Sequence, residues 1–255
     1  MTGTFLSTPT NAFSQYKFLQ PNIFEKQWTN FLKRYVATYE FRDHKPKTFK
    51  NLKDLNTKVQ SITFQLSREK TNDFPKEQYQ TIHFELTNPT LRHYQEMENE
   101  LKTIVETSEV NTKIVLTQTL RLQQITKNFL PVQKPNNDLA TNMTLNNNHM
   151  QALIELLKEY SPKEPLMIFY RFRYELSAIL KQLKKMKRSA NFIAKKMRKT
   201  TRDQAKTNFQ KEKMNTYVIQ IHANEITIEL SRTNTNIFYS LTHSFINYEQ
   251  AKAWP

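Results

Sequence analysis

The chain has 255 residues, with 38 Lys and Arg against 23 Asp and Glu, a formal net charge of +15, and no Cys. Without Cys, disulfides, thiolate zinc sites and cysteine nucleophiles are excluded. The cationic surplus favours a polyanionic partner such as nucleic acid, because neutralised phosphates release condensed counterions; the simpler alternative is a cationic surface without such a partner.

Glycine occurs once, at Gly3, which argues against a glycine-rich loop that cradles nucleotide phosphates. The six His are scattered, and no pair has the spacing of a helical metal site, so we expect no bound metal. No apolar run approaches the roughly 18 residues of a membrane span. We therefore expect no membrane association and a cytoplasmic protein, in the host-cell cytoplasm if a phage encodes it.

The first part of the chain is rich in aromatic residues. Between Phe13 and Tyr35 these residues recur at helical spacing, so helices are expected on both sides of Pro21. Residues 37–50 are polar and predict a loop, and residues 51–60 predict a short helix. Residues 61–67 alternate as in a strand.

The middle of the chain predicts two helices before a polar segment. Residues 79–86 are a strand candidate, and residues 89–106 and 112–126 predict helices. The Asn-rich residues 133–148 predict a linker or surface loop.

The last part alternates apolar strands with helices. Helices are predicted at 149–160, 173–187, 201–211 and 246–253, and strands at 166–170, 191–194, 216–221 and 235–239. Strands that are apolar throughout, with helices between them, indicate a parallel sheet covered on both faces, and hence an α/β fold.

Several segments together resemble one protein family. They are the opening MTGT, TLRLQQITKNFLP at 119–131, LMIFYRFRYELSAI at 166–179, TTRDQAKTNFQ at 200–210 and the long run 218–253. In this order they resemble the C-terminal part of a Swi/Snf-type superfamily-two DNA helicase or translocase, in particular its phage and bacterial members. The resemblance implies a RecA-like second helicase lobe at 77–255, preceded by a remnant of the first lobe and a helical linker at 1–76.

The resemblance also implies which positions belong to helicase motifs. They are Thr2, Gly3, Thr4, Tyr170, Glu229, Ser231, Arg232 and Gln250. The family binds ATP and Mg through a Walker A loop and an Asp-Glu box, but no GK[ST] occurs in this sequence. Where the family has a glycine-rich motif, residues 223–230 read ANEITIEL. No catalytic residue and no arginine finger is identified, so ATP and Mg are expected only in an assembled enzyme, and the isolated chain is expected to be inactive.

A basic run from Lys181 to Arg202 contains ten Lys or Arg and no acid. It is either a phosphate-tracking surface or the solvated outer face of two helices. With Arg121, which is either a contact near DNA or a helix-surface residue, the nucleic-acid candidates are Arg121, Lys184, Lys185, Lys187, Arg188, Lys195, Lys196, Arg198, Lys199 and Arg202.

Three hypotheses remain open. The chain is one part of a split helicase that works with a separately encoded first lobe, or a non-catalytic basic DNA-binding module, or a degenerate helicase remnant. An ATP-binding partner would favour the first hypothesis, and salt-sensitive DNA binding without such a partner would favour the second.

Overall fold

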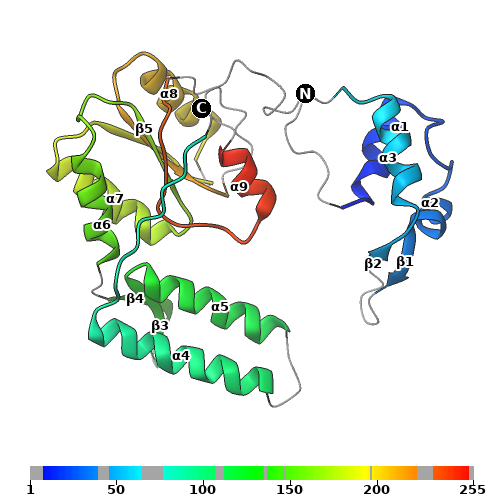
Figure 1. Cartoon of the computed structure of the whole chain (residues 1–255). Helices are drawn as coiled ribbons and strands as arrows, with labels where there is room; N and C mark the ends of the chain where they lie inside the picture. Colours follow the sequence, from blue (N-terminus) through cyan, green and yellow to red (C-terminus); the bar gives the residue numbers. More distant parts are fainter. Residues whose placement is uncertain are drawn as a thin grey trace. The chain divides into compact units, whose positions relative to one another are not determined.

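The structure is a computed structural model that describes residues 8–39, 46–64, 77–106, 112–134, 137–145, 148–195, 197–222 and 232–252. The chain divides into two compact units, Met1–Tyr79 and Gln80–Pro255 (Figure 1). Each unit is described by itself below.

The first unit is built around an aromatic core. Its helices are α1 (Asn11–Leu19), α2 (Trp28–Tyr35) and α3 (Leu52–Ser61). The helix spacing of Phe31 and Tyr35 places both side chains on one face, where they are fully buried. Phe24 packs edge-on against Phe31, with ring centroids 5.1 Å apart. The two helices expected between Phe13 and Tyr35, and the helix at 51–60, are confirmed.

Two sequence predictions for this unit are wrong. Instead of a loop at 37–50, strand β1 (Val36–Tyr39) pairs antiparallel with β2 (Pro46–Phe49). The paired strands are only four residues long and largely exposed, so they carry little apolar signal. Residues 61–64 end helix α3 rather than beginning a strand, and the rest of that predicted strand lies outside the described residues.

The second unit begins with an extended segment, a helix pair and a hairpin. Residues 80–87 contain no strand, so the strand predicted at 79–86 is wrong. Helices α4 (Asn88–Glu106) and α5 (Thr112–Thr126) form where helices were predicted, and they pack against each other. Strands β3 (Phe129–Lys134) and β4 (Asn137–Thr144) form an antiparallel hairpin where a polar linker was expected. The backbone hydrogen bonds between these two strands do not require an apolar sequence pattern.

The remainder of this unit is a parallel sheet with helices. Its elements are α6 (His149–Lys158), β5 (Leu166–Tyr170), α7 (Arg173–Lys185), β6 (Ala190–Ile193), α8 (Lys199–Gln210), β7 (Thr216–Gln220), β8 (Asn236–Phe238) and α9 (Phe245–Lys252). The strand order is β6-β7-β5-β8, and every pair is parallel. The predicted α/β fold with a parallel sheet is confirmed.

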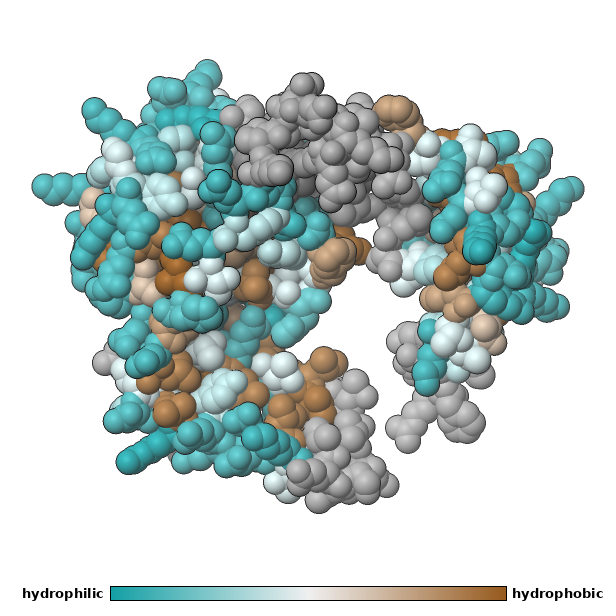
Figure 2. Space-filling view, in the orientation of Figure 1, coloured by the Kyte–Doolittle hydropathy of each residue, from teal (hydrophilic) through white to brown (hydrophobic). Residues whose placement is uncertain are grey.

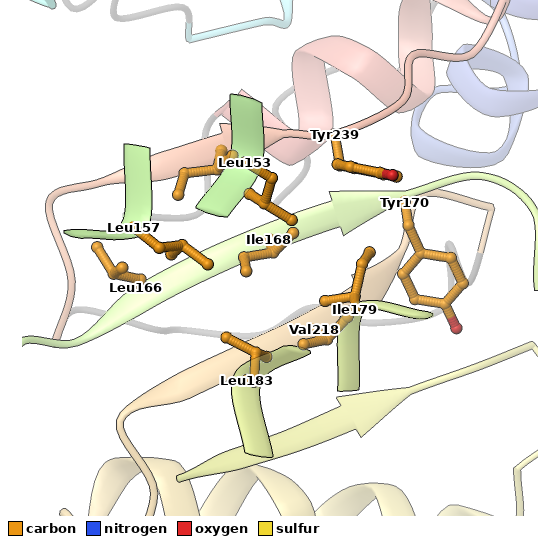
Figure 3. Packing of buried hydrophobic residues seen from close by; sticks show 10 residues of the cluster. Leu153, Leu157, Leu166, Ile168, Tyr170, Ile179, Leu183, Val218 and Tyr239 are labelled. Carbon is orange, nitrogen blue, oxygen red and sulfur yellow. The ribbon is translucent and has the colours of Figure 1, made fainter. Parts of the chain in front are cut away.

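Each face of the sheet is covered by its own helices. On one face, Leu153 and Leu157 of α6 and Ile179 of α7 pack onto Ile168 and Val218 (Figure 3). Alternate strand residues point the other way. On that second face, α8 and α9 pack through Ala205, Phe209 and Ala251 against Met167, Phe169, Tyr217 and Ile219. Full burial of each such apolar side chain contributes about 1.5–3 kcal/mol, which explains why β5 reads LMIFY without a polar residue.

Candidate nucleic-acid interface

The strand order creates a topological switch point at the carboxyl edge of the sheet. Strand β5 leads through α7 to β6, beyond one side of β7, whereas β7 leads to β8, beyond the opposite side of β5. The chain therefore leaves two adjacent strands, β5 and β7, in opposite directions. In open parallel sheets, ligands bind outside the carboxyl ends of the strands at such a point.

Polar residues lie at the carboxyl ends of three neighbouring strands. Arg171 directly follows β5, Gln220 ends β7, and Lys195 lies two residues after β6. The Gln220 side chain reaches both neighbouring loops: Nε2 donates to the Arg171 carbonyl oxygen at 3.1 Å, and Oε1 accepts from the Lys195 backbone N–H at 3.0 Å. One amide thus joins the segments that follow β5 and β6.

Both the backbone N–H and the guanidinium of Arg171 form hydrogen bonds. Its backbone N–H donates to Ser240 Oγ at 2.7 Å and to Glu175 Oε2 at 3.0 Å. Its guanidinium donates through Nη1 to Gln123 Oε1 and lies over the Phe172 ring, 5.1 Å from the centroid. Burial lowers the pKa of Arg171, and the negative field of Glu175 opposes that shift. Since an arginine pKa starts above 12, the side chain remains a cation.

The buried carboxylate of Glu175 stabilises the segment that follows β5. Glu175 is 1% exposed, and its Oε2 accepts from Phe172 N–H at 2.8 Å and from the Ser240 hydroxyl at 2.7 Å. It lies in the first turn of α7, where a carboxylate satisfies amide groups that have no partner within the helix. Burial raises the pKa of Glu175, and the hydrogen bonds from Phe172 and Ser240 oppose the shift.

His222, two residues after β7, also lies at the carboxyl edge. His222 Nδ1 lies 3.1 Å from Asn247 Nδ2, so the imidazole nitrogen accepts from the amide, and Nε2 lies 3.4 Å from Thr242 Oγ1. Burial lowers the pKa of His222, and the positive charges of Arg171 and Lys195 lower it further. These electrostatic effects indicate a cationic environment at the carboxyl edge.

The basic run 181–202 is divided between opposite edges of the sheet. Helix α7 runs from the carboxyl edge, where β5 ends, to the amino edge, where β6 begins, and its 13 residues span about 20 Å. Exposed Lys184, Lys185 and Lys187 therefore lie toward the amino edge. Lys195, Arg198, Lys199 and Arg202 lie in the segment after β6 and at the start of α8, toward the carboxyl edge. Figure 2 shows hydrophilic residues over α8 and its surroundings.

Two of the predicted arginines, Arg188 and Arg232, form hydrogen bonds within the fold. Arg188 is 4% exposed and donates to the carbonyl oxygens of Tyr160, Ser161 and Glu164 at 2.6–2.9 Å. Burial and these three acceptors commit the guanidinium to the loop before β5 and argue against the predicted phosphate contact. Arg232 similarly donates to Phe209 O at 2.7 Å, Met214 O at 2.8 Å and Asn215 Oδ1 at 2.8 Å.

The other predicted positions are dispersed. Tyr170 is fully buried, its hydroxyl donates to Ile193 O at 3.3 Å, and burial raises its pKa. Gln250 is half-buried in α9, and Arg121 donates to Gln124 Oε1 at 3.1 Å. The predicted positions Thr2, Gly3, Thr4, Lys196, Glu229 and Ser231 lie outside the described residues.

Sequence reasoning missed the residues that organise the edge, namely Gln123, Arg171, Glu175, Gln220 and His222. A local signal existed for two of them: Arg171 directly follows the buried strand β5 and Gln220 ends the buried strand β7, where parallel-sheet proteins place ligand contacts. Within the described ranges, no three metal-ligating side chains converge on one point. None of the helices described is long and apolar enough to cross a bilayer.

Comparisons with known proteins find a match to a helicase domain in part of the chain. Residues 148–253 match the family model described as the helicase conserved C-terminal domain. These residues contain the whole four-stranded sheet and its carboxyl edge. No curated protein sequence matches the chain.

A solved SWI2/SNF2 structure shares the fold. The Sulfolobus solfataricus SWI2/SNF2 ATPase core in complex with dsDNA aligns with a TM-score of 0.52 at 16% identity, over 90% of this chain and 48% of that one. The C-terminal domain of a Sulfolobus solfataricus SWI2/SNF2 ATPase aligns at 0.47 and 18%, over 61% and 68%. The C-terminal part of the Fun30 ATPase domain aligns at 0.39 and 17%, over 42% and 35%. The chain thus spans about a third of the Fun30 structure and about half of the DNA-bound core.

Proposed function

We propose that this chain provides the DNA-engaging C-terminal lobe of an ATP-dependent, Swi/Snf-type DNA translocase of the phage or bacterial branch. The match of residues 148–253 to a helicase C-terminal domain carries the proposal. The fold shared with a SWI2/SNF2 ATPase core in complex with dsDNA supports duplex DNA as the partner.

The cations of the carboxyl edge are the proposed contacts to the DNA backbone. Lys195, Arg198 and Lys199 are exposed, and the Arg171 backbone is fixed beside them through Gln220. Phosphate contacts by Lys and Arg supply affinity without reading sequence. The net charge of +15 would add long-range attraction to a polyanion.

ATP and Mg would act only in the assembled enzyme. No GK[ST] occurs in the sequence, so a lobe carrying a Walker A loop would have to hold the nucleotide phosphates and Mg. Closure of that lobe against this one would then move the DNA strand. In this scheme the described residues bind DNA backbone and transmit movement, and the other lobe supplies the hydrolytic chemistry.

The test is fluorescence anisotropy with labelled duplex DNA over a salt series. The triple variant Lys195→Gln, Arg198→Gln and Lys199→Gln removes three carboxyl-edge cations. The matched control, Lys181→Gln, Lys184→Gln and Lys185→Gln, removes the same charge from exposed positions of α7. All six substituted positions are exposed, so both variants should fold.

We expect the carboxyl-edge variant to lose more than about tenfold in affinity, and its slope of log K against log salt to fall by up to about 2.7, or 0.9 for each lost phosphate contact. The α7 control should keep most of the slope. Equal losses in both variants would mean that net charge alone drives binding, as in a basic DNA-binding module. No binding by the folded wild-type chain at low salt would reject the proposal.

A further inference from the structure

The side chain of Gln220 links two loops at the carboxyl edge of the sheet. Strand β7 lies between β5 and β6, and Gln220 is its last residue, opposite Tyr170. Just past Gln220, Ile221 N–H still donates to Tyr170 O at 2.8 Å, and beyond this hydrogen bond the strands lead into loops. The Gln220 amide continues the connection on both sides, with one hydrogen bond of 3.1 Å to Arg171 O and one of 3.0 Å from Lys195 N–H.

An amide is suited to this position because it combines a donor with an acceptor. The Arg171 carbonyl can only accept, and the Lys195 N–H can only donate. A Glu at this position would place a carboxylate oxygen against the Arg171 carbonyl, and a Lys would offer no acceptor to the Lys195 amide. Both contacts hold main-chain atoms, so they fix where each loop begins rather than where its side chain points.

The Lys195 loop carries charges proposed to contact DNA, and Arg171 adds a further cation on the neighbouring loop. Arg171 N–H is already fixed by Ser240 and Glu175, which makes the β5 loop a stable reference point. The loop after β6 is linked to that reference point through Gln220, and Arg202 also donates to Lys195 O at 2.6 Å. A change at position 220 would therefore weaken the link between the Lys195 loop and the Arg171 loop without removing a charge.

From this arrangement we infer that Gln220 is a positioning residue that sets the spacing between the cations of Arg171 and Lys195 for successive contacts on one DNA strand. The inference rests on the proposed DNA-binding function. It adds to that function a neutral residue, outside the basic run, whose effect on binding passes entirely through the two loops.

The experiment is a double-mutant cycle measured by duplex-DNA anisotropy on the full chain. Gln220→Met removes both hydrogen bonds while keeping side-chain length and neutrality. It is introduced into the wild type and into a Lys195→Gln background. Gln151→Met, at an exposed position of α6, is the matched control for the same chemical change.

We expect Gln220→Met to weaken binding about three- to tenfold in the wild type, comparable to loss of one phosphate contact, and less than about twofold in the Lys195→Gln background. The Gln151→Met control should bind as the wild type does. A purely structural role would lower the thermal midpoint and weaken binding by the same factor in both backgrounds, which would overturn the inference, as would unchanged affinity.

The outcome separates this inference from the proposed function. If the wild-type chain does not bind DNA, both the proposed function and the role of Gln220 are rejected. If the wild type binds DNA but Gln220→Met has no effect on affinity, or has the same effect in both backgrounds, only the role of Gln220 is rejected. If circular dichroism shows that Gln220→Met is unfolded, Gln220→Thr takes its place in the cycle, because Thr suits a strand but is too short to bridge both loops.

Discussion

Lys127 Nζ lies 3.0 Å from His149 Nε2, and the same imidazole nitrogen lies 3.1 Å from the Tyr239 carbonyl oxygen. The carbonyl can only accept, and an ammonium group can only donate, so one protonation state of His149 cannot serve both partners while Lys127 is charged. Burial is the main cause that lowers the pKa of Lys127 to about 8 and that of His149 to about 3. The pair therefore disfavours charge on both side chains.

His149 should make the fold sensitive to acid. Its pKa is about 3 in the folded chain and about 6.5 in the unfolded chain, so between these values the unfolded state binds a proton that the folded state does not. The stability contribution is thus present above pH 6.5 and is lost as pH falls. Urea unfolding at pH 7.5 and pH 5.0 should show that the wild type loses about 2 kcal/mol more than His149→Phe. Equal losses would contradict this assignment.

Replacement of Lys127 by Met should stabilise the protein near neutral pH. A folded pKa of about 8, below the ordinary 10.5, means that the charged folded state carries a penalty below pH 8, which disappears as pH rises through 10.5. We expect Lys127→Met to gain up to about 3 kcal/mol at pH 7, with a smaller gain at pH 9.5. Urea unfolding at both pH values measures the gain. A variant less stable than the wild type at pH 7 would show that the ammonium group stabilises the fold.

Loss of Glu175 should destabilise the second unit. Its Oε2 accepts hydrogen bonds from Arg171, Phe172 and Ser240 in a buried position. Glu175→Ala leaves these donors without that acceptor and should cost about 3 kcal/mol or more in the free energy of unfolding. Glu155→Ala, at an exposed position of α6, should change it by less than about 0.5 kcal/mol. Urea unfolding followed by circular dichroism compares the two variants, and a similar small effect of both would argue against the role of Glu175.

Arg188 should matter for stability and not for DNA affinity. Arg188→Lys keeps the charge but cannot present the same fork of donors to three carbonyl oxygens, so both Arg188→Lys and Arg188→Ala should cost about 2–4 kcal/mol. Thermal unfolding measures the loss, and anisotropy below the unfolding range measures DNA affinity. If Arg188→Lys is as stable as the wild type while Arg188→Ala binds DNA much more weakly, a contact between Arg188 and a DNA phosphate would be supported.

Local sequence patterns predicted most elements because their signals lie within single segments. The run LMIFY at 166–170 is apolar throughout and forms the central strand β5, buried on both faces. Helices α4 and α5 follow the periodicity at 89–106 and 112–126. The hairpins β1–β2 and β3–β4 were missed because a partner strand stabilises them through backbone hydrogen bonds that composition does not encode.

By itself, the sequence determined that the chain is basic, lacks Cys, and has an α/β segment with a buried parallel sheet, since charge and hydrophobic periodicity depend on residue type and order alone. Only the tertiary structure decided which cations share a surface. A single basic run, continuous from Lys181 to Arg202, is divided because α7 carries the chain from one edge of the sheet to the other, and β6 carries it back. The strand order likewise brings Arg171, Lys195 and Gln220 together across 50 residues, because hydrogen bonds follow proximity in space rather than in sequence.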